Sequence, residues 1–487
     1  MSPRQARLTV AAAVLGSIVV FVDSTVVNVA LPAIADDLGG GLAGQQWLSG
    51  AYLLTLGALL LVGGSLGDLH GRRRMFTIGL VAFGVTSILC ALAPTIETLV
   101  VARALQGAAG ALLVPNTLGL IVAKFPRNER GAAIGSWTAW SGIAMVGGPL
   151  IGGLIVDSAS WRWIFAINVL PVLAALAIVR QVDAEHDTPS AGRVDVVGAV
   201  LGTLGLAGPV FALIEQPQLG WGHPVIVVTL VGGLALLAAF IGYERRAPHP
   251  MLPLALFAQR NFAVGNASTL AVYGGLGASP FFLVLFLQQV GGYNALEAGL
   301  ATLPVTIIMF LLSRRFGALA DRWGPRLFMG AGPVVAGAGI ALFARIDASA
   351  DYPSQVLPAI VVFGFGLSLT VAPLTATVLG GVPESQAGMA SAINNAVARI
   401  GSLLAIAAIG AVVASQLGGS GTSFASVATG TAEHAFHVAV LVTGALVAIG
   451  GVLSALGIEN PKRDVCAADC PGGAVVGASR EVETVHA

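Results

Sequence analysis

The chain has 487 residues, and only 10% of them are charged, against about 25% in an average soluble protein. Hydrophobic residues make up 56%, which is more apolar side chain than a water-exposed surface could hide. The 24 Lys and Arg are balanced by 24 Asp and Glu. This composition excludes a soluble enzyme, and the balanced charge excludes a nucleic-acid-binding protein with a basic face. We therefore expect an all-α polytopic membrane protein that is not an enzyme.

Apolar windows long enough to cross a bilayer recur along the whole sequence. A hydrocarbon core about 30 Å thick needs about 20 apolar residues per helix. The first window follows Arg4 and Arg7 without a small-residue cleavage site, so we expect an uncleaved first helix. Fourteen windows qualify, and in chain order they are 8–33, 45–66, 76–94, 98–122, 131–156, 161–179, 195–215, 223–243, 262–289, 295–313, 327–345, 355–381, 386–415 and 435–457.

The distribution of basic residues predicts the orientation of these helices. With the N-terminus placed in the cytoplasm, 20 of the 24 Lys and Arg fall in cytoplasmic segments. Only Arg162 and Arg345 fall on the external side, and Arg103 and Arg399 fall inside helices. Cytoplasmic loops of membrane proteins carry such an excess of positive charge. The count therefore predicts an even number of helices with both termini in the cytoplasm.

A long-range repeat divides the chain. The segment "GSLGDLHGRRR" from Gly64 reappears 253 residues later as "GALADRWGPRL" from Gly317. An echo in the same orientation is typical of two parallel halves related by an axis along the membrane normal. We expect two six-helix bundles with two inserted helices between them. The predicted parts are an N-terminal bundle at 1–180, the inserted pair with its linkers at 181–261, a C-terminal bundle at 262–457, and a disordered cytoplasmic tail at 458–487.

Motifs in the order seen here resemble those of the major facilitator superfamily, in particular its fourteen-helix drug:proton antiporter branch. "GSLGDLHGRR" resembles the loop between helices two and three, and "LVVARALQGAAG" from Leu99 resembles the helix-four arginine motif. "DSTVVNVALP" from Asp23 and "SWRWIFAINV" resemble signatures of the branch. The resemblance covers nearly the whole chain. It implies a transporter in the bacterial plasma membrane that is driven by the proton gradient and needs no cofactor.

The resemblance also assigns roles to two groups of residues. The loop after the second helix would act as a conformational switch, in which Asp68 contacts the N-terminus of a helix near Ser385 in the other half; the alternative is that its arginines only set topology. A glycine motif in the fifth helix would close the cavity against proton leak; the alternative is ordinary helix packing. The loop residues are Gly64, Asp68, Gly71, Arg72 and Arg73, and the helix-five residues are Gly135, Gly148, Pro149, Gly152 and Gly153.

Two ionisable residues within the spans are the candidates for proton coupling. Asp23 is the only acid well inside a predicted span, and a charge in hydrocarbon is costly enough to suggest a function. Asp23 would load and release a proton as access alternates, or it would make structural hydrogen bonds. Arg103 shares one helical face with Gln106, Gly107 and Gly110. The resemblance gives Arg103 a part in proton movement, and a simple interhelical hydrogen bond is the alternative.

The second half carries a polar stripe at Ser391, Asn395, Arg399 and Ser402. Arg399 has no obvious acidic partner in any predicted span, so the middle of the membrane holds one acid and two bases. This balance favours neutral or anionic amphiphiles over dications as substrates. Polar and aromatic residues in the spans could line a substrate cavity, although aromatic residues at helical spacing more often face lipid or pack. The candidates are Asn28, Gln106, Trp137, Trp140, Tyr273, Asn394, Asn395 and Arg399.

The function that these features favour is export of an amphiphilic drug in exchange for protons. No G-x-x-x-x-G-K-[ST] segment is present, so ATP is not the expected energy source. One alternative is a dedicated exporter of a single endogenous product, such as an antibiotic, siderophore or lipid. Another is a membrane scaffold or sensor that does not transport. Cys466 and Cys470 lack the further ligands that a zinc site needs, so we expect no metal, and no role is assigned to them.

Overall fold

The computed structural model describes residues 3–182, 194–248, 250–383, 386–419 and 421–460, and all regular structure within them is helical. Cys466 and Cys470 lie outside these residues. The α-helices are α1 (Pro3–Leu38), α2 (Gly41–His70), α3 (Arg72–Ala91), α4 (Ile96–Lys124), α5 (Arg127–Ser158), α6 (Trp163–Ala166), α7 (Val169–Val179), α8 (Val196–Leu219), α9 (Pro224–Glu244), α10 (Arg260–Gln289), α11 (Ala295–Trp323), α12 (Pro325–Leu342), α13 (Leu357–Gly380), α14 (Ala387–Leu417) and α15 (Thr429–Gly457).

These helices occupy the predicted membrane spans. Thirteen helices of the described chain are long and apolar enough to cross a membrane, and a shorter apolar stretch covers Trp163–Val179. That stretch is α6 and α7, joined at Ile167 and Asn168, which keep right-handed helical backbone angles. Large apolar side chains such as Val101 and Val228 remain exposed on outward faces, as expected for helices that meet lipid. The predicted fold class is confirmed, and the fourteen windows agree with these helices.

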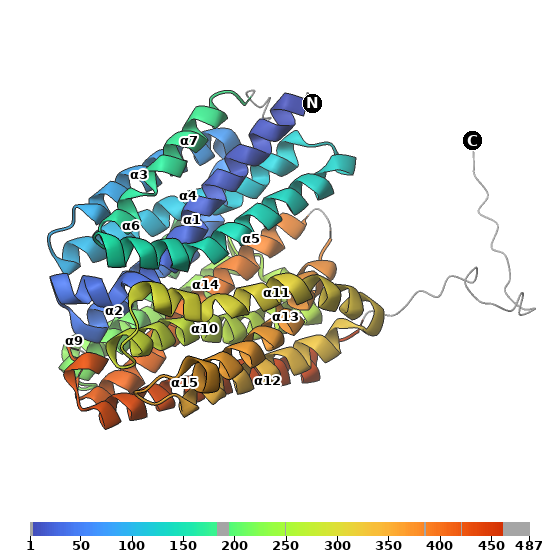
Figure 1. Cartoon of the computed structure of the whole chain (residues 1–487). Helices are drawn as coiled ribbons and strands as arrows, with labels where there is room; N and C mark the ends of the chain where they lie inside the picture. The colour runs from blue at the N-terminus through green and yellow to red at the C-terminus, as the bar shows by residue number, and fades with distance from the viewer. Residues whose placement is uncertain (1–2, 183–193, 249, 384–385, 420, 461–487) are drawn as a thin grey trace, which may run out of the picture.

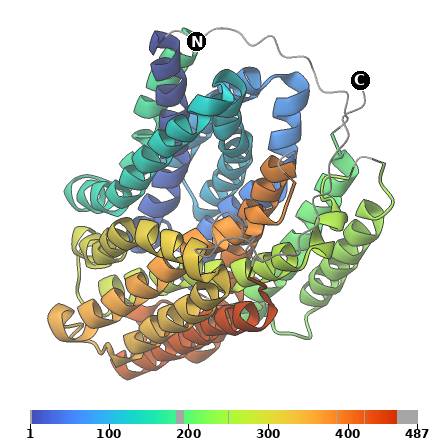
Figure 2. The ribbon, with the colours of Figure 1, turned by 90° about the vertical axis from the view of Figure 1, so that its right-hand side faces the viewer.

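The helices form two groups with a pair between them. Figure 1 shows the blue-to-teal helices α1–α7 in one group and the yellow-to-red helices α10–α15 in the other. Helices α8 and α9 pack on each other, and α8 also contacts α2 and α14; Figure 2 shows this green pair at the side of the molecule. Trp47 Nε1 on α2 donates to Glu215 Oε1 on α8 at 2.7 Å. The inserted pair is therefore fastened to both groups, while the residue boundaries of the domains remain predictions.

The duplicated loop has the same backbone geometry in both groups. Gly71 ends α2 and precedes α3 with φ 91°. Gly324 ends α11 and precedes α12, also with φ 91°. Glycine adopts this left-handed conformation without the steric cost that a Cβ brings. The repeat in the sequence therefore forms equivalent helix–turn–helix connections in two parallel halves.

The two groups meet at the face opposite the N-terminus. One apolar core there includes Val29 and Ile34 of α1 together with Phe281 and Phe286 of α10. Toward the N-terminal face, one side of α5 is open: a Cβ built at residue 131, 135 or 142 would meet no atom within 4 Å. The other side of α5 still packs there, with Ala133 against Ala13 of α1 and Ile121 of α4. The halves are thus tightly packed at one face, and one side of α5 is uncovered toward the other.

Candidate functional site

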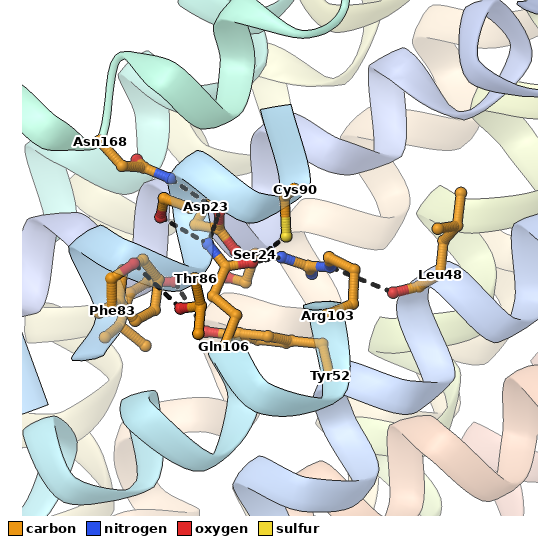
Figure 3. Close-up of polar contacts among 12 residues, drawn as sticks. Asp23, Ser24, Leu48, Tyr52, Phe83, Thr86, Cys90, Arg103, Gln106 and Asn168 are labelled. Atoms are coloured by element: carbon orange, nitrogen blue, oxygen red, sulfur yellow. Dashed lines mark hydrogen bonds and ion pairs between the residues drawn. The ribbon is translucent and has the colours of Figure 1, made fainter. Parts of the chain in front are cut away.

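A buried polar network lies at the centre of the first group of helices (Figure 3). Its carboxylate belongs to Asp23 of α1, whose side chain has 0% exposed surface. The Asp23 Oδ2 atom accepts a hydrogen bond from Arg103 Nη1 on α4 at 2.5 Å. Its Oδ1 atom accepts from Gln106 Nε2 at 3.0 Å and from Asn168 Nδ2 at 2.9 Å. One carboxylate therefore connects α1, α4 and the junction between α6 and α7.

The arginine of this network has several partners. Besides Asp23, Arg103 Nη1 donates to Gln106 Oε1 at 2.6 Å, and its Nε donates to the Leu48 carbonyl at 3.3 Å. The guanidinium also lies over the Tyr52 ring, with Cζ 4.2 Å from the ring centroid. Breaking a buried ion pair by removing one partner costs about 3–5 kcal/mol, because the remaining charge is left unpaired. This pair is therefore a strong constraint on the relative positions of α1, α2 and α4.

Gln106 lies inside the network. Its Nε2 donates to Ser87 Oγ at 2.9 Å as well as to Asp23, and its Oε1 also accepts from Cys90 Sγ at 3.6 Å. Gln106 is fully buried. The sequence pattern correctly places Gln106 on the helix face of Arg103. In the structure, however, its side-chain amide bonds to the ion pair, and the buried side chain has no exposed surface that could line a cavity.

Sequence reasoning missed three members of this network. Asn168, Ser87 and Tyr52 are all buried, and none was singled out. A signal existed for Asn168, which is an uncharged polar residue within the apolar segment "SWRWIFAINV". Ser87 and Tyr52 carried no comparable signal, because hydroxyl groups are common in membrane helices.

The switch-loop acid Asp68 pairs with an arginine of its own loop. Asp68 Oδ1 pairs with Arg72 Nη2 at 2.8 Å, one turn further along the chain, and the Asp68 side chain is 51% exposed. Ser385, the expected neighbourhood of its partner helix, lies outside the described residues, and α14 begins at Ala387. The contact of Asp68 with the helix near Ser385 therefore stays a prediction.

The other loop residues have separate roles. Arg73 Nε donates to the Val179 carbonyl at 3.1 Å, so Arg73 binds the C-terminal end of α7 instead of an acid. Gly71 provides the positive φ of the turn. Gly64 makes only ordinary contact, because its added Cβ would lie 3.6 Å from Pro115 Cβ.

The helix-five motif contacts both halves. A Cβ at Gly148 would clash with Thr25, and one at Gly152 would lie 2.8 Å from Val26 Cγ1. Both of these neighbours are on α1, so this side of α5 packs within its own group. The small residues allow the close approach of α1 and α5 that α-helices in membranes use.

The opposite side of α5 faces the second group. A Cβ at Gly153 would lie 2.5 Å from the Leu296 Cα atom on α11. A Cβ at Gly299 would lie 2.7 Å from the Pro149 carbonyl oxygen. Gly135 differs, since its added Cβ would meet nothing within 4 Å. Four of the five motif residues therefore lie at close helix contacts, and Gly135 does not.

An acid that the sequence analysis passed over connects the halves. Asp157, near the end of α5, accepts backbone hydrogen bonds from Ala295 at 3.1 Å and Leu296 at 2.9 Å. These are the first residues of α11, and a helix N-terminus attracts negative charge. This contact lies on the face opposite Asp68. Two glutamines add further bonds between the halves: Gln288 Nε2 donates to the Val29 carbonyl at 3.0 Å and Gln46 Nε2 to the Ile406 carbonyl at 2.8 Å.

The aromatic cavity candidates of α5 lie along α1. Trp137 Nε1 donates to Ser17 Oγ at 2.8 Å, which fixes the indole against α1. Trp140 is 56% exposed and lines an apolar groove of about 640 Å³ between α1 and α5, together with Arg7 and Val10. Only Trp140 is therefore open to a ligand on this surface.

The remaining cavity candidates are divided between structural and open positions. Asn394 Nδ2 donates to Thr269 Oγ1 at 2.8 Å, so it fastens α14 to α10. Tyr273 accepts a hydrogen bond at its carbonyl from Ser402 on α14. The others lie as follows: Asn28 is half-buried, Asn395 is exposed and bonded to its own helix, and Arg399 is half-buried between α2 and α10.

A duplicated helical bundle with a buried ion pair and an apolar exterior defines a polytopic membrane transporter. The family model "Major Facilitator Superfamily" matches residues 13–406 and again 316–469. The chain belongs to the Major Facilitator Superfamily.

Its relatives include exporters of drugs and antibiotics. The chain is 35% identical to the puromycin resistance protein pur8 of Streptomyces alboniger, over 95% of this chain and 93% of that protein. It is 35% identical to the multidrug resistance protein Stp of Mycobacterium tuberculosis, over 85% and 77%. It is 33% identical to the tetracenomycin C resistance and export protein of Streptomyces glaucescens, over 84% and 76%.

Solved structures support the same fold. The crystal structure of the POT family transporter PepTSo aligns with a TM-score of 0.67 at 14% identity, covering 94% of this chain and 98% of that chain. At this identity the likeness concerns the fold alone.

Proposed function

We propose that the protein is a proton-coupled antiporter, which exports amphiphilic drugs or other toxic small molecules across the bacterial plasma membrane by alternating access. The observation that carries the proposal is the fully buried pair of Asp23 and Arg103, in a chain whose relatives are drug and antibiotic exporters. The excess of basic residues on the N-terminal face supports cytoplasmic termini. The proton gradient supplies the energy, and no cofactor takes part.

The network around Asp23 explains how protonation would be linked to conformation. The ionised carboxylate holds donors from α4 and from the α6–α7 junction. A proton on Asp23 removes the charge that Arg103 pairs with. Arg103 would then retain Gln106 Oε1 and the Leu48 carbonyl, so opening the pair does not leave its guanidinium without partners. Proton binding would therefore loosen α1 from α4, and these two acceptors would offset part of the cost of about 3–5 kcal/mol that an unpaired buried charge carries.

The test is proton-driven transport in proteoliposomes with purified Asp23→Asn. We expect the variant to lose substrate transport driven by an imposed pH gradient while retaining downhill exchange of substrate. Asp37→Asn is the matched control, since Asp37 is on the same helix and pairs with Arg162 at 2.6 Å but is exposed. The control should keep its coupling. Wild-type proton flux in Asp23→Asn upon addition of substrate would refute the assignment of coupling to Asp23.

A dedicated exporter remains the second candidate, since several relatives are named for one compound. Tetracenomycin C and puromycin each give a relative its name, whereas Stp is named for multidrug resistance. Expression in a drug-sensitive host distinguishes the two candidate functions. Protection against chemically unrelated compounds would support the broad exporter, and protection against one compound class would support the dedicated one.

A further inference from the structure

The second group of helices holds a cation that lacks a protein partner. Arg399 lies in the middle of α14 and is half-buried. Across residues 3–182, 194–248, 250–383, 386–419 and 421–460, its guanidinium forms no ion pair and no hydrogen bond. Arg103, the other arginine within a span, is bonded to three residues. A partly buried unpaired charge is costly in a membrane, so it indicates a function.

The position of Arg399 is at the boundary between the two halves. A Cβ built at Gly57 of α2 would lie 3.2 Å from Arg399 Cβ. About one turn further along α14, the Ser402 hydroxyl donates to the Tyr273 carbonyl of α10 at 2.8 Å. Arg399 therefore lies between the two groups of helices, where a substrate in an alternating-access transporter would bind.

The same face of α14 is open toward the N-terminal side of the molecule. Asn395 is one turn away from Arg399 and is exposed. Gly388, two turns further, is also exposed, and its added Cβ would meet nothing within 4 Å. Residues spaced by seven and four lie on one side of a helix. A molecule approaching along this side would reach Arg399 past a polar amide and without an obstructing side chain at Gly388.

Asp23, the acid assigned to proton coupling, already has three hydrogen-bond donors. Asp23 is bound by Arg103, Gln106 and Asn168, so it offers no free oxygen charge to a cationic ligand. Of these two in-membrane groups in the described part of the chain, the one without a partner is Arg399, and its charge is positive. A guanidinium presents paired donors that match a carboxylate in a bidentate arrangement.

We propose that Arg399 recognises the acidic group of the substrate and that the exported molecules are amphiphiles carrying a carboxylate. This inference rests on the proposed export function. It adds a class of substrate and the residue that selects it. The apolar body of such a molecule would lie against the apolar helix faces beside Asn395 and Arg399.

Equilibrium binding to the full-length protein in lipid nanodiscs tests the proposal. The probes are the fluorescent acid 11-(dansylamino)undecanoate and its methyl ester, which differ in charge but hardly in apolar surface. We expect the wild type to bind the acid about tenfold or more tightly than the ester, since a charge-assisted hydrogen bond contributes that much. Arg399→Gln should remove this preference, and Arg399→Lys should restore part of it. Arg345→Gln, which removes an exposed charge at the end of the span Pro325–Arg345, should leave it unchanged.

Several results would overturn the inference. Equal affinity of the wild type for the acid and the ester would contradict the proposal. This measurement needs no variant, so it remains decisive if Arg399→Gln does not fold. Retained preference in a folded Arg399→Gln, or its absence in Arg399→Lys, would contradict the proposal as well. Binding is measured without a gradient, so the outcome is independent of proton coupling. A charge preference that depends on Arg399, together with absent proton-driven transport, would refute the proposed function and leave the recognition site standing.

Discussion

Among the described residues, Asn168 is the one donor to Asp23 that comes from neither α1 nor α4. Its Nδ2 lies 2.9 Å from Asp23 Oδ1, and both side chains are buried. A hydrogen bond to a charged group contributes about 1.5–3 kcal/mol. We expect Asn168→Ala to lower the midpoint of thermal unfolding in detergent, measured by loss of monodisperse protein on gel filtration. Ser24→Ala is the control, because Ser24 donates only to the Phe21 carbonyl on its own helix. Equal midpoints for the two variants would show that Asn168 does not hold the network.

The sequence predicted which charged residues are buried better than it predicted their hydrogen-bond partners. The helical spacing of Arg103 and Gln106 correctly placed both side chains on one face, and the cost of a buried acid singled out Asp23. Which donors reach Asp23 depends on how α7 approaches α1, and that geometry is set by the short turn at Ile167 and Asn168. Apolar patterning does not encode such a turn.

Helices α5 and α11 approach so closely at Gly153 that a side chain at this position should separate them. The Cβ of a residue at 153 would lie 2.5 Å from the Leu296 Cα atom, and backbone cannot move aside as a side chain can. We expect Gly153→Val to reduce transport at least tenfold at matched expression. The matched control is Gly142→Val on the same helix, where an added Cβ meets nothing within 4 Å and transport should persist. Similar rates in both variants would contradict a role for this contact. Transport is measured as substrate uptake into everted vesicles.

The helices themselves were predictable because a backbone in lipid must satisfy its hydrogen bonds internally, which a helix does. The length of each apolar run therefore locates each span. The contact faces were harder to predict, because nearly every side of a membrane helix is apolar. In α2, for example, Gly64 was singled out, whereas its neighbours Gly63 and Gly67 make the close approach to Ala111 and Asn116 of α4. In α5 the glycine pattern pointed correctly to close contacts, but it could not separate Gly135 from the others.

The two halves of the molecule are in contact at one face. Two acids on opposite faces suggest how the protein would change between its two access states. Asp157 binds the N-terminus of α11 in the other half, while Asp68 pairs only locally with Arg72. The duplicated sequence predicted the parallel halves. It could not predict which face is closed, because both arrangements bury the same apolar pattern. We infer that Asp157 and Asp68 favour opposite states.

Removal of either charge should therefore shift the balance between the states in opposite directions. An anion at a helix N-terminus contributes about 0.3–1 kcal/mol, which corresponds to roughly a two- to fivefold change in the population ratio. Spin labels at the exposed positions 131 on α5 and 315 on α11 would report the separation of the halves at the N-terminal face by pulsed electron resonance. We expect Asp157→Asn to increase the short-distance population and Asp68→Asn to decrease it. Asp36→Asn, an exposed acid on the same face as Asp157, should change neither. If both variants gave the wild-type distribution, the closed face would be held by the apolar core around Val29 and Phe281 alone, and the acids would have no part in alternation.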